Sequence, residues 1–361
     1  MSRRTFLEKS AVAATGAALG VPAAESLAQA GAAGPPRLKL GFDNFSIRAL
    51  KWKAPEIIAY AARQKVDALL LSDLDVYGDP RDESAVKRAG ALCREAGIEL
   101  QVGSLSICPT STRFDKRWGT AEEHLGLLLK VAKNAGATVA RCVLGFAEDR
   151  RTPGGIEARI RDTVDVLKKV RSQAVGDGIR IAVENHAGDM QAWELKGLIE
   201  AAGSDFVGCT IDSGNATWAL EDPQVTLDTL APHIDSSGIR DSMIWEYPEG
   251  AKVQWTAMGD GLVDWKAFFA RWTRSVPEKP VILEIISGFS RPFAYLQPDF
   301  WEPYEKVRTP EFARFLALAR KGREIPPFKA SESLSEAAYQ QQELEKSLTF
   351  CRETLGLGRK H

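Results

Sequence analysis

The chain is 361 residues long, with 44% apolar and 26% charged side chains, a composition typical of a globular protein with ample material for a core. Its 47 basic and 48 acidic side chains give a formal net charge of −1, and no basic patch stands out. Nucleic acid and anionic membrane surfaces are therefore poor candidates as partners.

The first 30 residues have the features of an export signal. The segment 2–9 (SRRTFLEK) resembles the twin-arginine motif, a short Ala/Gly-rich apolar run follows it, and Ala28-Gln29-Ala30 offers a small-x-small cleavage site. The apolar run is too short and too rich in Ala and Gly to hold as a transmembrane helix, so we expect no stable membrane anchor. We predict a signal peptide over residues 1–30, read by the twin-arginine export machinery, a linker over 31–37 and a periplasmic or secreted mature protein. The alternative is a disordered tail with a chance Arg-Arg pair.

Strand-like and helix-like runs alternate along the rest of the chain. The predicted strands span residues 38–42, 68–71, 98–102, 138–144, 179–183, 207–211, 236–239 and 281–283. The predicted helices span residues 54–64, 84–96, 121–135, 156–175, 193–202, 225–231 and 264–274, and a further helix is introduced by Thr309-Pro310-Glu311. Strict alternation of short apolar strands with helices is typical of a parallel sheet covered by helices.

Eight such units fit a (β/α)₈ TIM barrel better than an open doubly wound sheet, because no GxGxxG motif follows the first strand. The predicted fold class is therefore α/β, a single-domain barrel over residues 38–322. The polar tail over residues 323–361 is predicted to contain a helix at 332–355 that packs on the outside of the barrel.

Three predicted strands end on a carboxylate, namely Glu184, Asp212 and Glu284. The C-terminal tips of barrel strands converge on one face, where active sites lie. Carboxylates gathered there raise one another's pKa, and a divalent cation would resolve the conflict. Oxygen-rich sites suit Mg²⁺ or Mn²⁺, with Zn²⁺ or Co²⁺ where an imidazole joins. The alternative is that each acid is paired with an arginine or a helix N-terminus.

Four motifs in chain order resemble the xylose isomerase-like TIM barrels, the sugar (phosphate) isomerase/epimerase superfamily. They are Glu184-Asn185-His186, Asp212-Ser213-Gly214-Asn215, the Gly259-Asp260-Gly261 segment that continues to Trp265, and Leu283-Glu284. The resemblance covers residues 38 to about 322. It implies a metal held by Glu, Asp, His and Glu at the ends of strands five to eight. It also implies that the two glutamates move protons on either face of the substrate carbon.

Three of these four ligands carry over, onto Glu184, Asp212 and Glu284. The strand-seven histidine does not, because the matching segment is Gly238-Ile239-Arg240-Asp241 and a glycine stands at the ligand position. Asp241, His186 or a water is expected to fill the coordination sphere. Asn215 also stands where the family often has a histidine.

The predicted substrate-binding residues combine polar side chains with aromatic rings. Sugar rings have apolar C–H faces that stack on aromatic side chains, while acids and amides bind their hydroxyl groups. The candidates are His186, Asn215, Arg240, Trp218, Trp245 and Trp255. His186 could equally be a metal ligand or a histidine satisfied at the edge of a loop, and Arg291 is a further candidate for binding a substrate oxygen.

The resemblance implies a divalent-metal-dependent sugar isomerase or epimerase that acts on a carbohydrate or keto-sugar. Glu184 or Glu284 would remove a proton next to a carbonyl to give an enediolate. Expulsion of a β-substituent would instead make the protein a 3-keto-glycoside lyase or hydratase. A non-catalytic sugar-binding protein is the alternative from another class. With four histidines in the chain, the His-rich multi-zinc endonuclease branch of this fold is disfavoured. Oligomerisation is left open.

Overall fold

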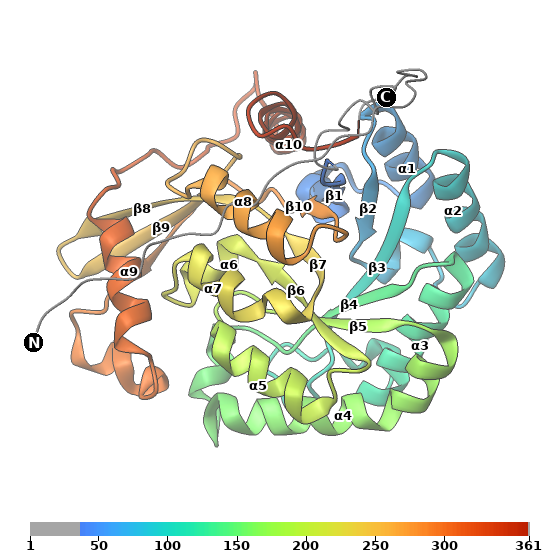
Figure 1. Ribbon diagram of the computed structural model, residues 1–361, viewed down its shortest axis with the longest axis horizontal. Coiled ribbons are helices and arrows are strands. Elements are labelled where there is room, and N and C mark those ends of the chain that lie inside the picture. The colour runs from blue at the N-terminus through green and yellow to red at the C-terminus, as the bar shows by residue number, and fades with distance from the viewer. Residues whose placement is uncertain (1–36, 360–361) are drawn as a thin grey trace, which may run out of the picture. The chain divides into compact units, whose positions relative to one another are not determined.

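The computed structural model describes residues 37–359, and eight parallel strands form a nearly closed barrel at its centre (Figure 1). The strands pair in the order β10-β1-β2-β3-β4-β5-β6-β7. A parallel bridge between Ile239 and Leu283 joins the segment after β7 to β10 and closes the ring. The barrel strands are β1 (Leu40–Asp43), β2 (Ala68–Leu71), β3 (Glu99–Ser106), β4 (Val139–Val143), β5 (Arg180–Glu184), β6 (Val207–Asp212), β7 (Ile234–Gly238) and β10 (Val281–Leu283). The predicted TIM barrel is confirmed.

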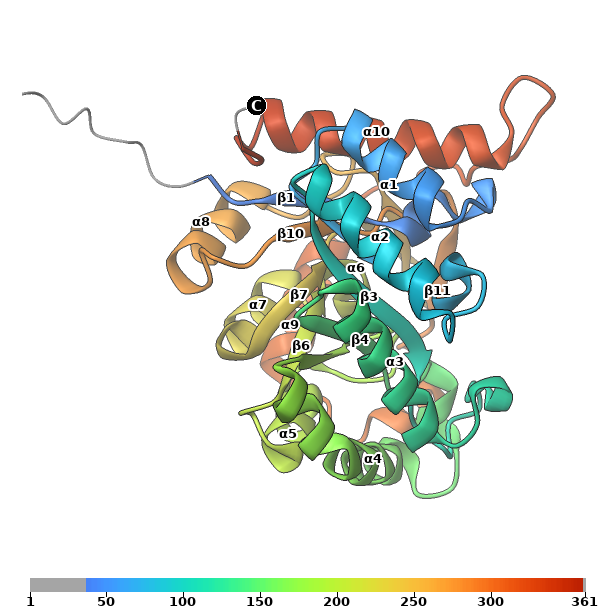
Figure 2. The ribbon, with the colours of Figure 1, turned by 90° about the vertical axis from the view of Figure 1, so that its right-hand side faces the viewer.

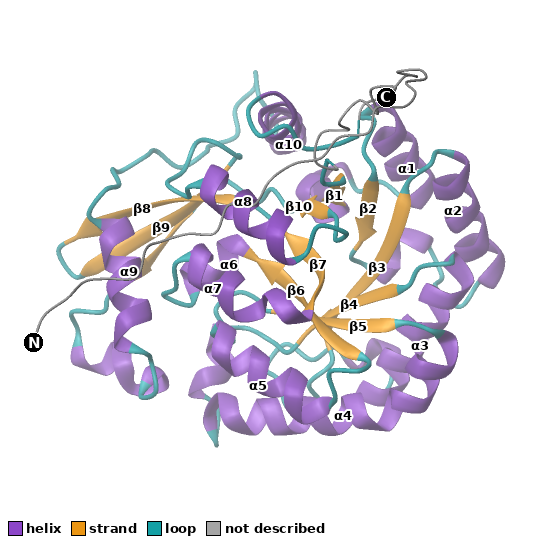
Figure 3. Ribbon diagram, viewed as in Figure 1, coloured by secondary structure: helices purple, strands orange, loops and turns teal. Residues whose placement is uncertain are grey.

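Helices surround the strands, as the purple ring around the orange centre in Figure 3 shows. The α-helices of the described residues are α1 (Ala54–Arg63), α2 (Glu83–Glu95), α3 (Ala121–Ala135), α4 (Gly155–Asp177), α5 (Ala192–Ala202), α6 (Ser213–Trp218), α7 (Pro223–Leu230), α8 (Trp265–Ser275), α9 (Thr309–Ala319) and α10 (Glu336–Glu353). Each of the eight strands predicted from the sequence is present within a few residues of its expected bounds. The predicted signal peptide and nearly all of the linker lie outside the described residues.

Local sequence signals explain where these elements begin and end. Residues of β4, β6 and β7 are buried throughout, as expected for strands covered on both faces. Helix α3 begins with a capping box, in which Thr120 accepts from the backbone of Glu123 and the Glu123 side chain accepts from Thr120. It ends at Gly136, whose φ of 75° lies in the left-handed region that glycine adopts without strain. The chain can therefore turn directly into the next strand.

The tail helix α10 takes the place of the eighth helix of the barrel (Figures 1 and 2). Its buried residues Leu344, Leu348 and Cys351 belong to the main core. Glu345 accepts a hydrogen bond from Tyr60 of α1 at 2.9 Å, so α10 lies against the first helix. The tail packs outside the strands as predicted, but a division at residues 322 and 323 would separate one barrel helix from the rest.

A second, antiparallel sheet extends from the C-terminal end of the barrel and was not foreseen from the sequence. It contains β8 (Asp241–Tyr247), β9 (Gly250–Thr256) and β11 (Ser290–Phe293), in the order β11-β9-β8. Helix α9 packs on it, and Phe315 of α9 lies in the same apolar cluster as Ile244, Val253 and Phe293. Figure 1 shows β8 and β9 beside α9, away from the barrel axis. This sheet brings Trp255 to the loops that follow β6 and β7. No helix within residues 37–359 is long and apolar enough to cross a membrane.

The buried histidine of α3 provides a test of the packing on this side of the barrel. His124 is 1% exposed and its Nε2 lies 2.6 Å from Ser104 Oγ of β3. Burial, with a smaller contribution from the Arg117 charge, lowers the pKa of His124 to about 4 from 6.5. Since the unfolded chain then binds the proton more tightly, stability should fall as pH drops from about 6.5 towards 4.

We expect His124→Gln to reduce this loss of stability by about 2 kcal/mol at pH 5, because glutamine takes up no proton. Unfolding curves at pH 8 and pH 5 measure it. The difference at pH 8, where the imidazole is neutral in both states, gives the packing cost alone. Equal pH slopes for the two proteins would contradict a buried, neutral His124.

Candidate active site

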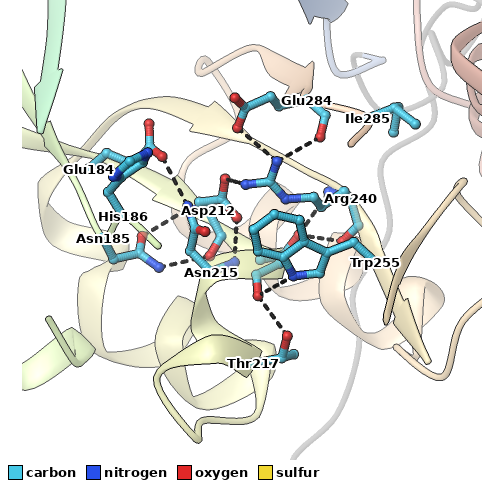
Figure 4. A network of polar contacts seen from close by, with 12 residues as sticks. Glu184, Asn185, His186, Asp212, Asn215, Thr217, Arg240, Trp255, Glu284 and Ile285 are labelled. Carbon is cyan, nitrogen blue, oxygen red and sulfur yellow. Dashed lines mark hydrogen bonds and ion pairs between the residues drawn. The ribbon is translucent and has the colours of Figure 1, made fainter. Parts of the chain in front are cut away.

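Three carboxylates from three strand ends meet at the C-terminal face of the barrel (Figure 4). Glu184 is the last residue of β5, Asp212 is the last residue of β6, and Glu284 directly follows β10. One oxygen atom from each lies within 4.8 Å of the others. The three residues are 1%, 0% and 5% exposed, so solvent hardly screens their charges. The sequence prediction that these acids come together is confirmed.

Two arginines neutralise most of this charge. Arg240, which follows β7, binds Asp212 Oδ2 through Nη2, and its Nη1 lies 3.0 Å from Glu284 Oε2 and 3.1 Å from the Glu284 carbonyl oxygen. Arg141 in β4 donates from Nε to Glu184 Oε2 at 2.5 Å. Burial lowers the pKa of both guanidinium groups, but the neighbouring carboxylates outweigh it and raise them. Both arginines are therefore fixed cations at any working pH.

The position of Arg240 is fixed at both ends of the residue. Its backbone N–H donates to Ser213 Oγ at 3.0 Å, and that hydroxyl donates to the Arg240 carbonyl at 2.7 Å. The guanidinium carbon lies 4.1 Å from the centre of the Trp255 ring, a cation–π distance. The predicted substrate-binding residue Arg240 thus lies among the acids, as a partner of two of them.

Two asparagines hold the acids in register. Asn185 exchanges two hydrogen bonds of 2.8 Å with the backbone of Asp212 and so ties the ends of β5 and β6 together. Asn215 donates from Nδ2 to Glu184 Oε1 at 3.0 Å, while its backbone N–H donates to Asp212 Oδ1 at 2.7 Å. Asn215 Oδ1 is buried and has no hydrogen-bond partner within the described part of the chain. It therefore remains available to a hydroxyl donor.

His186 lies beside Glu184 (Figure 4), at the start of the loop after β5. Its Nδ1 lies 2.7 Å from the Gly145 carbonyl oxygen, and its ring meets the edge of Phe146. Burial, followed by the Arg141 charge, lowers the pKa of His186 to about 4. The imidazole is accordingly neutral near pH 7, with Nδ1 as the protonated nitrogen that donates to Gly145.

Aromatic rings form a stack beside Arg240. Trp218 and Trp255 lie face to face with ring centres 3.8 Å apart, and Phe289 meets the edges of both. Phe289 is 41% exposed, whereas Trp255 is 4% exposed, so the stack leads from the surface to the Arg240 guanidinium. Arg291 lies over Trp218. Trp245, also predicted to bind substrate, lies opposite Lys252 in the β8–β9 hairpin and is not part of this stack.

Asp241, a predicted metal ligand, lies outside the acid cluster. One of its oxygens accepts from the Trp265 indole at 2.8 Å and from the backbone of Gly259 and Gly261 at 3.1 Å. The other accepts from Ser242 and Val263. Burial raises the pKa of Asp241 to about 6 despite these donors. Its carboxylate anchors the loop before α8 and has no free oxygen for a cation.

Two residues of the network were missed by the sequence analysis. Asp43 ends β1, is 2% exposed and accepts from Ser72 Oγ at 2.5 Å. Burial and the Glu284 charge raise the pKa of Asp43 to about 8. Arg141 is the second. A carboxylate directly after the first predicted strand, and a charged residue within the fourth, were the available signals.

The arrangement of donors does not fit a divalent cation beside Arg240. Three carboxylates are a suitable oxygen donor set for Mg²⁺ or Mn²⁺. However, Arg240 nitrogen atoms already contact Asp212 Oδ2 and Glu284 Oε2, and Arg141 holds Glu184 Oε2. A divalent cation would have to share these three carboxylates with two guanidinium groups. The metal thus stays a prediction, and the cations that the structure shows beside these acids are Arg240 and Arg141.

A cavity of about 500 Å³ lies next to the aromatic stack. It shares Trp255 with the stack, and Tyr339 and Glu343 of α10 help to line it. Two of its lining residues, Gln254 and Thr256, have buried side-chain oxygens without a partner in the described residues. Such groups are costly unless a ligand or water satisfies them, so the cavity suits a polar, hydroxylated molecule.

The parallel strands and the carboxylates at their ends define a TIM barrel with an acidic site at its C-terminal face. Comparison with known proteins gives the family. The model of the family described as "Xylose isomerase-like TIM barrel" matches residues 58–300. Since this stretch is more than half of the chain, the protein belongs to the xylose isomerase-like TIM barrel family.

Solved structures share the fold. D-psicose 3-epimerase, solved in the presence of D-fructose, superposes with a TM-score of 0.61 and 13% identity, over 88% of this chain and 100% of that one. A xylose isomerase domain protein from Planctomyces limnophilus gives a TM-score of 0.52 and 17% identity, over 69% and 89%. The uncharacterised protein YihM of Escherichia coli (strain K12) is 25% identical over 164 residues, 42% of this chain and 49% of its own length. The match therefore spans about half of that relative.

The role of Asp241 leads to a prediction about stability. In Asp241→Asn one oxygen becomes an NH₂ group that faces N–H donors. We expect the free energy of unfolding to fall by about 2–4 kcal/mol, because the buried N–H donors lose a charged acceptor. Asp260→Asn, on the exposed part of the same loop, is the control and should cost under about 1 kcal/mol. Denaturant unfolding checks both, and equal effects would contradict the anchoring role.

Proposed function

We propose that this protein is a sugar isomerase or epimerase that removes a proton next to a carbonyl group. The observation that carries the proposal is the meeting of Glu184 and Glu284, from the ends of two different strands, beside a fixed cation. A carboxylate is a suitable base for such a proton, and a nearby cation stabilises the oxygen charge that develops. Family membership and epimerase neighbours of the same fold support this choice.

The reaction starts with a carbonyl and a C–H bond on the adjacent carbon. Glu184 or Glu284 takes the proton, the C–H electron pair forms a carbon–carbon double bond, and the carbonyl electron pair moves onto oxygen to give an enediolate. Return of the proton to the former carbonyl carbon, with the hydroxyl proton of the adjacent carbon passing to the charged oxygen, gives isomerisation. Return of the proton to the opposite face of its original carbon gives epimerisation. Hydrogen bonds from Arg141 and Asn215 keep Glu184 aimed at this space.

Three features support a carbohydrate as the substrate. The stacked Trp218 and Trp255 rings offer apolar faces for the C–H side of a sugar. Asn215 Oδ1 is an unpaired acceptor next to the acids, and Trp218 Nε1 is an unpaired donor in the stack, among the described residues. The cavity beside Trp255 offers further unpaired polar groups, on Gln254 and Thr256, for a hydroxylated molecule.

A lyase or hydratase acting on a 3-keto-glycoside shares the first half of this reaction. It differs in that the enediolate expels a β-substituent instead of taking the proton back. The products separate the two, because a lyase releases an aglycone and an epimerase conserves mass. A binding protein without catalysis would exchange no substrate hydrogen at all.

Substitution of each glutamate tests the proposal. We expect Glu184→Gln and Glu284→Gln to lower the rate of deuterium incorporation from D₂O into D-fructose or D-psicose about 100-fold or more, because an amide cannot take the proton. Mass spectrometry of the recovered sugar measures the exchange. Glu95→Gln, an exposed change in α2, is the control. Wild-type rates in both site variants would refute the proposal, and exchange of other ketoses and of 3-keto-glycosides is measured in parallel.

We also propose that the protein is exported through the twin-arginine route, which suits a domain that folds before export. Arg3→Lys combined with Arg4→Lys should retain the protein in the cytoplasm at its full precursor length. Immunoblots of cytoplasmic and periplasmic fractions measure this, with Arg37→Lys as the control. Unchanged export of the double variant would contradict the proposal.

A further inference from the structure

The Arg240 guanidinium contacts the carboxylate oxygens that lie next to Gly238, the position without a metal-binding histidine. Gly238 stands where the family resemblance of the sequence implies a metal-binding histidine. A Cβ atom built at Gly238 would lie 2.9 Å from Asp212 Oδ2 and 3.3 Å from Glu284 Oε2. These are the two oxygens that the Arg240 guanidinium contacts. A side chain at position 238 and the Arg240 guanidinium would therefore compete for the same space.

A second glycine makes room for the arginine stem. A Cβ atom at Gly214 would lie 2.3 Å from Arg240 Nε, 2.6 Å from Cγ and 2.7 Å from Cδ, distances that no side chain tolerates. The carbonyl of Gly214 accepts from the Trp255 indole at 2.9 Å, which holds that ring over the guanidinium. Gly214, Trp255 and Ser213 thus form a seat built for an arginine, and not only a gap that a mobile side chain has entered.

We propose that Arg240 replaces the divalent cation at this site, so that the protein is a metal-independent member of its family. The positive charge is carried by the chain itself and is shared by Asp212 and Glu284. In its chemical consequence the inference rests on the proposed function, because Arg240 would then be the cation that stabilises the enediolate oxygen after a glutamate has taken the proton.

The formal charges agree with this replacement. The three carboxylates and the two arginines sum to −1. Without Arg240 the sum is −2, which one divalent cation would balance. With Arg240 present, a divalent cation would reverse the sign of the buried cluster to +1 and would have to displace hydrogen bonds from two of its three ligands. If neither Arg240 nor a metal ion were present, the unbalanced charge of the buried carboxylates would strongly destabilise the folded protein.

Metal binding by the full-length protein tests the inference. The protein is treated with EDTA, incubated with MnCl₂ and desalted, and bound manganese is measured by plasma mass spectrometry beside a thermal unfolding curve. We expect the wild type to retain less than about 0.1 Mn per chain and to keep its unfolding temperature unchanged, because Arg240 already occupies the cation position. About one Mn per chain, lost in Glu284→Gln, would overturn the inference.

Two variants of Arg240 separate charge from packing. Arg240→Met leaves three acids and one arginine, so we expect it to bind about one Mn²⁺ per chain and to be stabilised by it. Arg240→Lys keeps the positive charge and is the matched control, expected to bind none. If folded Arg240→Met and Arg240→Lys both bind no manganese, the cluster is not a vacated metal site and the inference is wrong. If Arg240→Met fails to fold, the wild-type measurement still decides.

The metal measurement does not depend on turnover, so the two proposals can fail separately. A wild type that takes no manganese and exchanges deuterium in the presence of EDTA supports both. One that binds manganese and needs it for exchange overturns the inference and leaves the proposed function standing. One that takes no manganese and exchanges no sugar supports the inference and counts against the proposed function.

Discussion

The gathering of like charges at the end of the barrel is the constraint on which the rest of the site depends. Parallel strands deliver Glu184, Asp212 and Glu284 to one small buried region, where three like charges lie within 4.8 Å of one another. Burial raises the pKa of Asp212 well above its ordinary value, and the Arg240 charge opposes that rise. A cation is therefore a requirement of the fold at this point, whether a metal or the chain supplies it.

Much of the surrounding structure serves to position that cation. Ser213 fixes the Arg240 backbone, Gly214 leaves room for its stem, and Trp255 covers its face. Trp255 reaches this place only because β8, β9 and β11 form a sheet beyond the barrel end. The same tryptophan belongs to the aromatic stack and to the neighbouring cavity. Through Trp255, the antiparallel sheet thus connects the charged acid cluster with the aromatic surface on which a sugar would stack.

Asp241 illustrates how a strand-end carboxylate can be structural instead. It directly follows Arg240, and from the sequence it was a candidate to complete the coordination sphere of a metal. In the folded chain its two oxygens accept from five N–H groups, which leaves them satisfied without a cation. Helix α10 is a comparable case at the level of the fold. It lies within a polar tail of the sequence, yet it fills the eighth helical position against Tyr60.

The sequence alone determined the barrel and the three acids that meet at its mouth. Burial on both faces gives parallel strands a continuous apolar pattern, and strand ends in a barrel share one face, so the position of Glu184, Asp212 and Glu284 follows from local pattern and topology. Only the tertiary structure decided the partners of these acids. Arg141 lies in β4 and Arg240 follows β7, far along the chain from the acids that they contact. Because long flexible side chains can reach in many directions, no local pattern encodes where a guanidinium ends. The identity of the cation at this site is accordingly a property of packing, set by glycines at 214 and 238 as much as by the arginine.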